Sequence, residues 1–344
     1  MPAHSTHTLQ PGQRIRVLVV DDSVVIRRLV CHALEQDPLM EVVGVASNGT
    51  IALERIAQLK PDVLTLDIEM PEMDGLTLLR ELRPRYPHLR VVMFSTLTAR
   101  GGAATLEALA LGADDYVTKA SNAGSLDVSL HNLQGELLPK IRQFFSTPAA
   151  PHAPQTQVPA TQRKGRSEVI VIGVSTGGPS ALAALIPQLP ANLRVPLLIA
   201  QHMPPLFTRL LAERLDASSP LEIREGAEGA SVVPGKVYVA PGDFHMRLAR
   251  VRGGVELRLD QGPQLNSCRP AVDALFSSAA DIYGSTVTAA VLTGMGQDGL
   301  DGARRLKARG STVIVQDEAS SVVWGMPGAV ANAGLADEIL PLSL

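Results

Sequence analysis

The chain has 344 residues and a formal net charge of −3, and 45% of its residues are hydrophobic and 19% charged. This composition is typical of a globular protein that is long enough for two domains. The nearly neutral charge and the lack of a long basic run argue against a nucleic-acid partner. No apolar run reaches the roughly 20 residues of a membrane helix, and the first residues lack the apolar core of a secretory signal. We therefore expect a cytoplasmic protein without direct membrane insertion.

The first half, residues 14–137, alternates short β-branched runs with helical stretches, which predicts a parallel sheet covered by helices. The run "RVLVV" is followed by Asp21 and Asp22, and "DVLTL" is followed by Asp67. Ligands of such sheets bind beyond the carboxyl ends of the strands, so we expect these carboxylates to lie together. Crowded carboxylates favour a hard divalent cation such as Mg²⁺. The alternative for one aspartate alone is a helix cap or a strand end.

Two later strand ends favour a phosphoryl site over these simpler readings. "VVMFS" ends in Ser95 and "DDYVTK" ends in Lys119, which adds a hydroxyl and an ammonium group to the acids. With "MPEMDG" after Asp67, this ordered set resembles the receiver domain of bacterial response regulators. The resemblance implies a five-stranded doubly wound, flavodoxin-like fold.

In such a receiver Asp67 would accept the phosphoryl group from a histidine kinase. The resemblance also implies that Asp21, Asp22, Asp67 and Glu69 hold Mg²⁺, with Glu69 contributing its backbone. Lys119 would pair with the phosphoryl group, and Ser95 and Tyr116 would couple it to the surface. Receivers usually have proline after this lysine, whereas this chain has Ala120.

The segment "STPAAPHAPQTQVPATQRKGR", residues 146–166, is rich in proline and almost free of large apolar residues. Such a segment cannot bury a core and is typical of an extended linker. We place a linker at 138–166 and a second α/β domain at 167–344. Cys31 and Cys268 form no CxxC pair, so we expect reduced, structurally incidental thiols.

The second domain begins with the strand "EVIVI", the turn "GVSTGGP" and a helical stretch. A dinucleotide site would need G-x-G-x-x-G and an acid after the next strand. Here Ser175 occupies the place of the middle glycine, and the next strand ends in Gln201-His202, so both requirements fail. The turn instead fits a nucleophilic serine, which needs a base and an orienting acid.

His202 and His245 are the histidines beyond the linker, and His202 has the better position at a strand end. Asp298 follows the strand "TVTAAVLTG", whereas Asp301 falls in the first turn of the next helix. Taken alone, His202 could instead be a surface imidazole, and Asp298 could be a helix cap. Three complementary groups at three strand ends favour a Ser175, His202 and Asp298 triad. Because α/β-hydrolases place the acid before the histidine, this order predicts a different, Rossmann-like parallel-sheet fold.

The runs "GVSTGGP", "QHMP", "YVAPGD", "RPAVD" and "LTGMGQDG" resemble the catalytic domain of chemotaxis protein-glutamate methylesterases. The resemblance implies that Thr176 assists His202 and that backbone N–H groups around Gly294 and Met295 form an oxyanion hole. Gly328 stands where the family often has a basic residue. No cofactor is implied for the ester hydrolysis itself.

The expected function is hydrolysis of glutamate γ-methyl esters, and deamidation of selected glutamines, on the cytoplasmic helices of chemoreceptors. We expect the receiver to restrain this activity until Asp67 is phosphorylated. Two alternatives remain open at this point. One is a phosphorylation-gated binding module with a degenerate hydrolase half, and the other is a serine hydrolase for a different carboxyl derivative.

Overall fold

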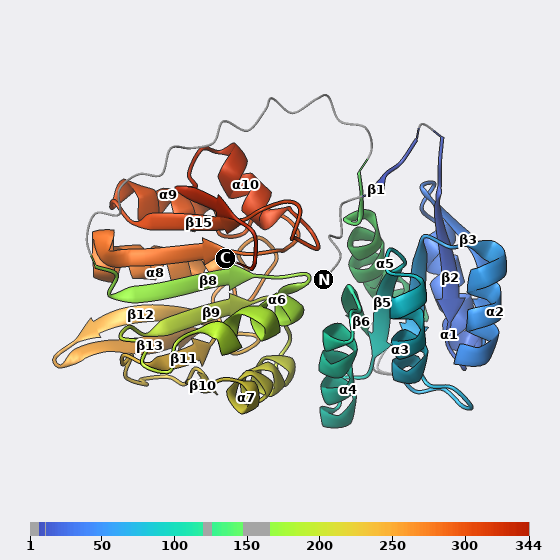
Figure 1. The fold of residues 1–344 in the computed structure, drawn as a ribbon, viewed down its shortest axis with the longest axis horizontal. Coiled ribbons are helices and arrows are strands. Elements are labelled where there is room, and N and C mark those ends of the chain that lie inside the picture. The colour runs from blue at the N-terminus through green and yellow to red at the C-terminus, as the bar shows by residue number, and fades with distance from the viewer. Residues whose placement is uncertain (1–6, 11, 120–125, 147–165, 344) are drawn as a thin grey trace. The chain divides into compact units, whose positions relative to one another are not determined.

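The computed structural model describes residues 7–10, 12–119, 126–146 and 166–343. The chain divides into two compact units, Met1–Ala153 and Pro154–Leu344. Both are layered arrangements of parallel strands and helices (Figure 1). The predicted combination of two parallel-sheet α/β folds is confirmed. Each unit is described separately below.

The first unit contains the predicted five-stranded sheet, in the order β3-β2-β4-β5-β6. All neighbouring pairs are parallel. The strands are β2 (Ile15–Val20), β3 (Met40–Ala46), β4 (Val63–Asp67), β5 (Arg90–Ser95) and β6 (Asp115–Thr118). Every residue of β4 and of β5 is buried, as expected for central strands covered on both faces. The carboxyl ends of these strands therefore meet at one edge of the sheet.

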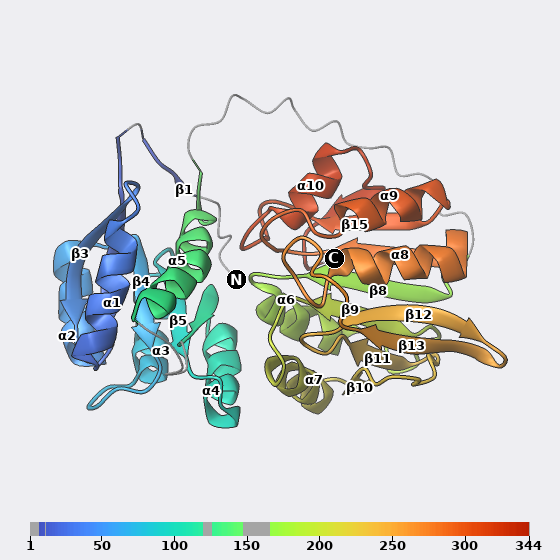
Figure 2. The same cartoon turned by 180° about the vertical axis from the view of Figure 1, so that it is seen from behind.

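Among the described residues of this unit, five helices cover the sheet (Figure 2). They are α1 (Val24–Glu35), α2 (Gly49–Leu59), α3 (Gly75–Arg85), α4 (Ala99–Ala110) and α5 (Leu126–Arg142). Helix α1 packs on α5, while α2 packs on α3 and α3 on α4. Gly75 begins α3 against the end of β4, where a Cβ atom would lie 2.1 Å from the carbonyl oxygen of Asp67. Glycine is therefore required for the loop that returns past Asp67.

Helix α5 extends beyond the predicted domain boundary at residue 137. It continues to Arg142 and leads into β7 (Phe145–Ser146), which pairs with β1 (His7–Thr8). Leu137, Ile141 and Phe144 are fully buried, so this stretch belongs to the receiver core. The first part of the predicted linker is thus folded. Residues 147–165 of that linker, and Ala120, lie outside the described residues.

The second unit has a seven-stranded parallel sheet in the order β10-β11-β9-β8-β14-β15-β16. Its strands are β8 (Val169–Val174), β9 (Leu197–Gln201), β10 (Glu222–Glu225), β11 (Lys236–Val239), β14 (Val287–Val291), β15 (Thr312–Gln316) and β16 (Glu338–Leu340). The helices are α6 (Gly178–Leu185), α7 (Phe207–Ser218), α8 (Val272–Tyr283), α9 (Leu300–Ala308) and α10 (Met326–Asn332). Helices α8 and α9 pack together, as do α6 and α7. The strand order reverses at β8, which makes this strand the centre of the fold.

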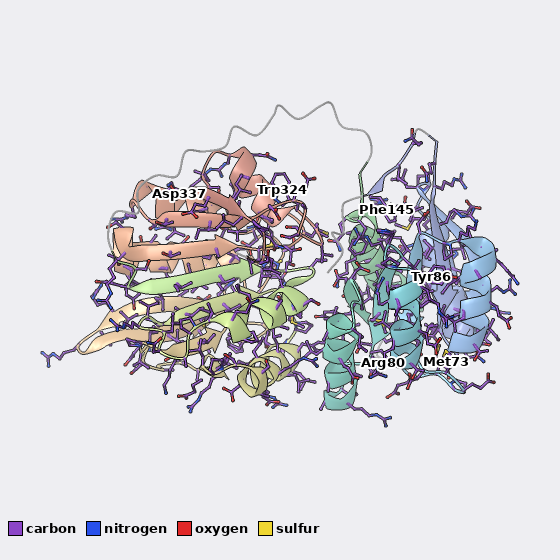
Figure 3. All side chains as sticks on the ribbon, viewed as in Figure 1. Met73, Arg80, Tyr86, Phe145, Trp324 and Asp337 are labelled. Atoms are coloured by element: carbon purple, nitrogen blue, oxygen red, sulfur yellow. The ribbon has the colours of Figure 1, made fainter. Side chains whose placement is uncertain are left out.

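An antiparallel hairpin of β12 (His245–Val251) and β13 (Gly254–Asp260) interrupts the parallel pattern, a feature that the sequence analysis does not predict. Strand β12 packs on α8, and the loop after β13 returns the chain to the start of that helix. Near the carboxyl end of the chain, the Trp324 indole donates Nε1–H to the Gln316 carbonyl at 3.0 Å (Figure 3). Among the described residues, no helix combines the length and apolar character needed to cross a bilayer.

Candidate active site and phosphoryl site

Three adjacent parallel strands bring the predicted hydrolase residues to one edge of the second sheet. Ser175 follows β8, His202 follows β9, and Asp298 lies in the loop between β14 and α9. In the sheet, β8 lies between β9 and β14. Ligands of doubly wound folds bind in the crevice where the strand order reverses, and β8 is that position here. The fold thus explains how residues more than a hundred positions apart become neighbours.

The His202 ring bridges the serine and the acid. Its Nε2 lies 2.7 Å from Asp298 Oδ2, and its Nδ1 lies 3.1 Å from Ser175 Oγ. An ionised carboxylate can only accept hydrogen bonds, so the ring proton belongs on Nε2. In the neutral ring the Nδ1 lone pair is then left to accept the Ser175 hydroxyl proton. This is the geometry that a serine nucleophile and its general base require.

The Asp298 carboxylate is buried and heavily hydrogen-bonded, with 1% of the residue exposed. Its Oδ2 accepts the backbone N–H of Val272 at 2.6 Å, and its Oδ1 accepts those of Asp273 and Gly299 at 3.1 and 2.9 Å. Burial opposes ionisation, but the contacts with His202 and these amides outweigh it and lower the pKa of Asp298. The acid therefore stays charged beside the imidazole.

The same carboxylate acts on the imidazole. Burial by itself disfavours a charged ring, but hydrogen bonding to Asp298 and the contact with Cys268 raise the pKa of His202 above its ordinary range. The protonated ring is thereby stabilised, which is the state that a general base reaches when it takes the proton of a serine hydroxyl.

The backbone around Ser175 is fixed from several sides. Its N–H donates to the Thr293 carbonyl at 3.0 Å, and its carbonyl accepts the Gly178 N–H at 2.8 Å. The Gln201 side chain donates Nε2–H to the carbonyls of Ser175 and His202 at 3.0 and 3.3 Å. Gln201 thus ties the backbone of the serine to that of the histidine, a role that its place before His202 did not reveal.

The predicted oxyanion-hole residues differ in what they can contribute. The Gly294 N–H already donates to the Val323 carbonyl at 3.0 Å, so it is not a free donor for an oxyanion. Gly294 instead permits close packing, since a Cβ atom there would lie 2.8 Å from Ser175 Cβ. Met295 is 41% exposed beside it. Thr176 is buried, and its carbonyl accepts the Thr293 hydroxyl at 2.9 Å.

The alternative base, His245, and the alternative acid, Asp301, lie in different surroundings. His245 is buried and its Nε2 is 3.0 Å from the Pro263 carbonyl. The Asp301 side chain is 77% exposed and pairs with Arg304 at 2.6 Å.

The loop between β13 and α8 adds contacts that the sequence analysis missed. Cys268 is not incidental as predicted, because its Sγ lies 3.4 Å from His202 Nδ1. Asn266 donates Nδ2–H to Asp298 Oδ1 at 3.1 Å and to Asp273 Oδ2 at 2.9 Å. No local signal marks these residues, because the loop reaches the site only through the hairpin.

In the first unit, the carboxylates of Asp21, Asp22 and Asp67 each place an oxygen within 4.8 Å of the other two. Lys119 Nζ lies 2.9 Å from Asp21 Oδ2 and 2.7 Å from Asp67 Oδ2. Burial raises the pKa of Asp67 to about 6 despite the opposing contact with Lys119. Burial alone would lower the pKa of Lys119. The contacts with Asp67 and Asp21 outweigh this effect, so the pKa of Lys119 is raised.

This cluster fits a hard divalent ion, because its donors are closely spaced carboxylate oxygens. A cavity of about 280 Å³ opens over it and is lined by Asp22, Asp67, Glu69, Thr96 and Lys119, among others. Glu69 thus lines the same cavity as Asp22 and Asp67. Bound Mg²⁺ would offset the charge of these carboxylates.

Ser95 is the last residue of β5, whereas Tyr116 lies within the neighbouring strand β6. The Ser95 hydroxyl accepts a hydrogen bond from Thr105 Oγ1 at 2.5 Å and donates to the Gly101 carbonyl at 3.2 Å. It is therefore linked to α4. Tyr116 is buried, and Lys140 Nζ lies 4.8 Å from the centre of its ring.

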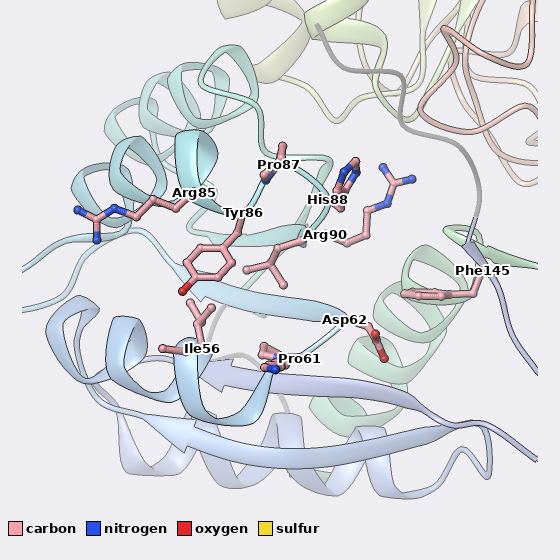
Figure 4. A pocket seen from close by; sticks show the side chains of 12 residues that line it. Ile56, Pro61, Asp62, Arg85, Tyr86, Pro87, His88, Arg90 and Phe145 are labelled. Carbon is pink, nitrogen blue, oxygen red and sulfur yellow. The ribbon is translucent and has the colours of Figure 1, made fainter.

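A larger cavity of about 710 Å³ lies at the opposite edge of the receiver sheet, by the amino ends of β4 and β5. Asp62, Tyr86, His88 and Phe145 are among its lining residues (Figure 4). It belongs to neither cluster of predicted site residues.

Comparisons with known proteins agree with this arrangement. Residues 170–344 match the family described as CheB methylesterase, and residues 17–131 match the response regulator receiver domain. A protein-glutamate methylesterase/protein-glutamine glutaminase of Nocardioides sp. is 52% identical over 96% of this chain and 93% of its own length. The protein of the same description from Thermotoga maritima is 44% identical over 95% of each chain.

A solved structure, the catalytic domain of Thermotoga maritima CheB methylesterase, is 48% identical and has a TM-score of 0.51. It covers 52% of this chain and 94% of that chain. The identity over nearly the full length and the two matched domains show that this chain belongs to the protein-glutamate methylesterase/protein-glutamine glutaminase family, carboxylic ester hydrolases with a response-regulator receiver domain.

Proposed function

We propose that the chain hydrolyses glutamate γ-methyl esters on chemoreceptors with Ser175 as nucleophile, His202 as base and Asp298 as orienting acid. The observation that carries this proposal is the His202 ring, which contacts Ser175 Oγ through Nδ1 and Asp298 through Nε2. The substrate class comes from the names of the relatives, which also include deamidation of glutamine.

The first half-reaction forms an acyl-enzyme. His202 Nδ1 takes the Ser175 hydroxyl proton as Oγ attacks the γ-carbonyl carbon, and the resulting imidazolium is stabilised by Asp298. Collapse of the tetrahedral intermediate breaks the bond to the methoxy oxygen, and Nδ1 returns the proton so that methanol leaves. With a glutamine side chain, ammonia leaves instead.

The second half-reaction releases the product. Nδ1 takes a proton from a water molecule, which attacks the acyl carbon, and the proton then returns to Ser175 Oγ as glutamate is freed. Developing charge on the carbonyl oxygen needs N–H donors. Because the Gly294 N–H is engaged, Met295 is our remaining candidate among the predicted pair, with Thr176 supporting the turn.

We further propose that the receiver regulates this activity through Asp67, which would accept a phosphoryl group from a chemotaxis histidine kinase. Asp21, Asp22 and the Glu69 backbone would hold Mg²⁺, and Lys119 would face the phosphoryl oxygens. The contact of Lys119 with both Asp21 and Asp67 supports this assignment. The hydroxyl of Ser95 and the ring of Tyr116 would report the change, and unphosphorylated receiver would restrain the esterase.

A single variant tests the nucleophile. Ser175→Ala should abolish methanol release from methylated receptor membranes while leaving acyl-phosphate labelling of Asp67 unchanged, since the two sites lie in separate units. Substantial methanol release from the variant would reject Ser175 as the nucleophile. Failure of the wild-type chain to release methanol, with activity on another ester, would reject the substrate instead.

A further inference from the structure

The loop between β13 and α8 brings a tight turn to the triad. Leu265 and Cys268 exchange two backbone hydrogen bonds, of 2.8 and 3.2 Å, around Asn266 and Ser267. Both central residues have positive φ angles, 49° for Asn266 and 61° for Ser267. Asparagine adopts this left-handed conformation more readily than most residues, whereas serine does so rarely, so the contacts around the turn contribute to holding it.

The Asn266 side chain is part of what holds it, and it joins two buried acids. Its Nδ2 carries two protons, and the structure places Asp298 Oδ1 at 3.1 Å and Asp273 Oδ2 at 2.9 Å. Asp298 and Asp273 are 1% and 8% exposed. Two like charges at this depth repel each other, and one amide shared between them offsets that repulsion.

Asn266 holds the oxygen of Asp298 that does not touch the histidine. Oδ2 faces His202 Nε2 at 2.7 Å, whereas Oδ1 accepts Asn266 together with two backbone amides. Asn266 and His202 donate side-chain hydrogen bonds to this carboxylate, and the Asp273 side chain also lies against it. Without the Asn266 amide, Oδ1 would keep its two backbone donors, but that side chain would no longer offset the repulsion between the Asp298 and Asp273 carboxylates.

A separate backbone hydrogen bond holds Asp273. Its Oδ1 accepts the Gly302 N–H at 2.6 Å, so it is held between the starts of α8 and α9. Burial, and then the charge of Asp298, raise the pKa of Asp273 to about 6. The neighbour of the orienting acid is thus a second carboxylate with a raised pKa, and it repels Asp298 when it is ionised.

We propose that Asn266 is a positioning residue of the esterase, which bridges Asp273 and Asp298 and so keeps Asp298 aimed at His202. The inference rests on the proposed function, in which Asp298 orients the base. Asn266 acts through Asp298 and has no contact with the reacting serine. Its removal should therefore lower kcat and leave KM unchanged.

The test uses the full chain and a matched pair of variants. Asn266→Gly removes the amide and tolerates the positive φ, while Ser267→Gly loosens the same turn at a residue whose hydroxyl makes no hydrogen bond to a described residue. We expect kcat for methyl-ester hydrolysis to fall at least about tenfold in Asn266→Gly. Ser267→Gly should stay within about twofold of wild type. Equal losses in both variants would show that only the rigidity of the turn matters and would overturn the proposal.

A double-mutant cycle shows whether Asn266 acts through Asp298. In an Asp298→Asn background, Asn266→Gly should cause little further loss of kcat, because the group that it positions is already gone. A full additional loss would overturn the proposal. If Asn266→Gly fails to fold, Asn266→Asp keeps the shape but removes both donors and adds a third carboxylate, and wild-type kcat in that variant would also overturn it.

The same cycle separates this inference from the proposed function. Wild-type activity in Asp298→Asn would reject the triad itself. Strong loss in Asp298→Asn with no loss in Asn266→Gly would leave the triad standing and reject only the role of Asn266.

Discussion

His202 presents Nε2 to Asp298, at 2.7 Å, and this contact determines which nitrogen is left for chemistry. The Asp298 carboxylate accepts a hydrogen bond from Nε2–H, which leaves Nδ1 facing Ser175 Oγ as the atom that we propose exchanges protons with the serine and the leaving group. Because Nδ1 faces Ser175 Oγ while Nε2 faces Asp298 Oδ2, the ring lies between the serine and the acid.

His202→Ala should lower kcat/KM by roughly 10²–10⁴-fold, the usual consequence of removing a general base. His245→Ala should mainly lower the thermal midpoint of unfolding, because His245 is a buried side chain bonded to the Pro263 carbonyl. Steady-state methanol release and thermal melts of both variants would establish the ranking. A larger activity loss in His245→Ala would identify it as the base.

Asp298→Asn should move the rising limb of the pH profile of kcat/KM to lower pH and reduce its plateau. Contacts with Asp298 raise the pKa of His202, so the ring releases its proton at higher pH than an ordinary imidazole. Activity that needs a neutral ring is low below that pKa and rises through it. Removing the carboxylate charge lowers the pKa of His202, so the rising limb of the profile moves to lower pH.

The matched control for this variant is Asp301→Asn, which changes an exposed carboxylate paired with Arg304. Its profile should overlay that of the wild type. A shifted limb in Asp301→Asn, with an unshifted one in Asp298→Asn, would move the acid to Asp301.

Alkylation of Cys268 should inactivate the esterase. Its Sγ is 3.4 Å from His202 Nδ1, so an added carboxamidomethyl group would crowd the nitrogen that contacts Ser175. Cys31→Ala should remain sensitive to iodoacetamide, whereas Cys268→Ala should become resistant. The Cys31 thiol lies in the other unit, and burial raises its pKa, which slows its reaction. Resistance conferred by Cys31→Ala instead would contradict the assignment.

Gly294→Ala should lower kcat by about 10-fold or more, because a displaced nucleophile loses its reactive geometry. The new Cβ would lie 2.8 Å from Ser175 Cβ and 2.5 Å from Met326 Sδ, and the serine would have to shift. Gly253→Ala, in an open part of the β12–β13 turn, is the control and should behave as wild type. An unchanged kcat in Gly294→Ala would show that Met326 alone gives way.

Asp67→Asn should abolish the response of the esterase to a small phosphodonor and leave only the basal rate. The residue lies 2.7 Å from Lys119 in the predicted phosphoryl site, and it belongs to a different unit from the triad. Methanol release with and without acetyl phosphate and Mg²⁺ provides the measurement.

A fragment of residues 167–344 is the companion to Asp67→Asn. Freed from the receiver, it should hydrolyse methyl esters faster than the unphosphorylated full chain. A slower fragment would mean that the receiver contributes to catalysis or substrate capture and does not restrain it.

The sequence by itself determined the two α/β folds and the strand ends that carry the acids, the serine and the histidine. Buried parallel strands appear as continuous apolar runs, and their carboxyl ends share one edge, so Asp21 and Asp67, or Ser175 and His202, could be placed together without coordinates. The turn around Ser175 could be separated from a dinucleotide site because each motif has local requirements.

Only the tertiary structure decided the contacts made by segments whose position no local pattern encodes. The hairpin of β12 and β13 returns the chain beside the triad, which brings Asn266 and Cys268 to Asp298 and His202. The Gly294 N–H is engaged by Val323, a residue far along the chain. Helix α5 likewise extends to Arg142, because Ile141 and the following Phe144 are buried in the core of the first unit. In each case burial and hydrogen bonding across distant segments outweigh local propensity, and these depend on the packed fold.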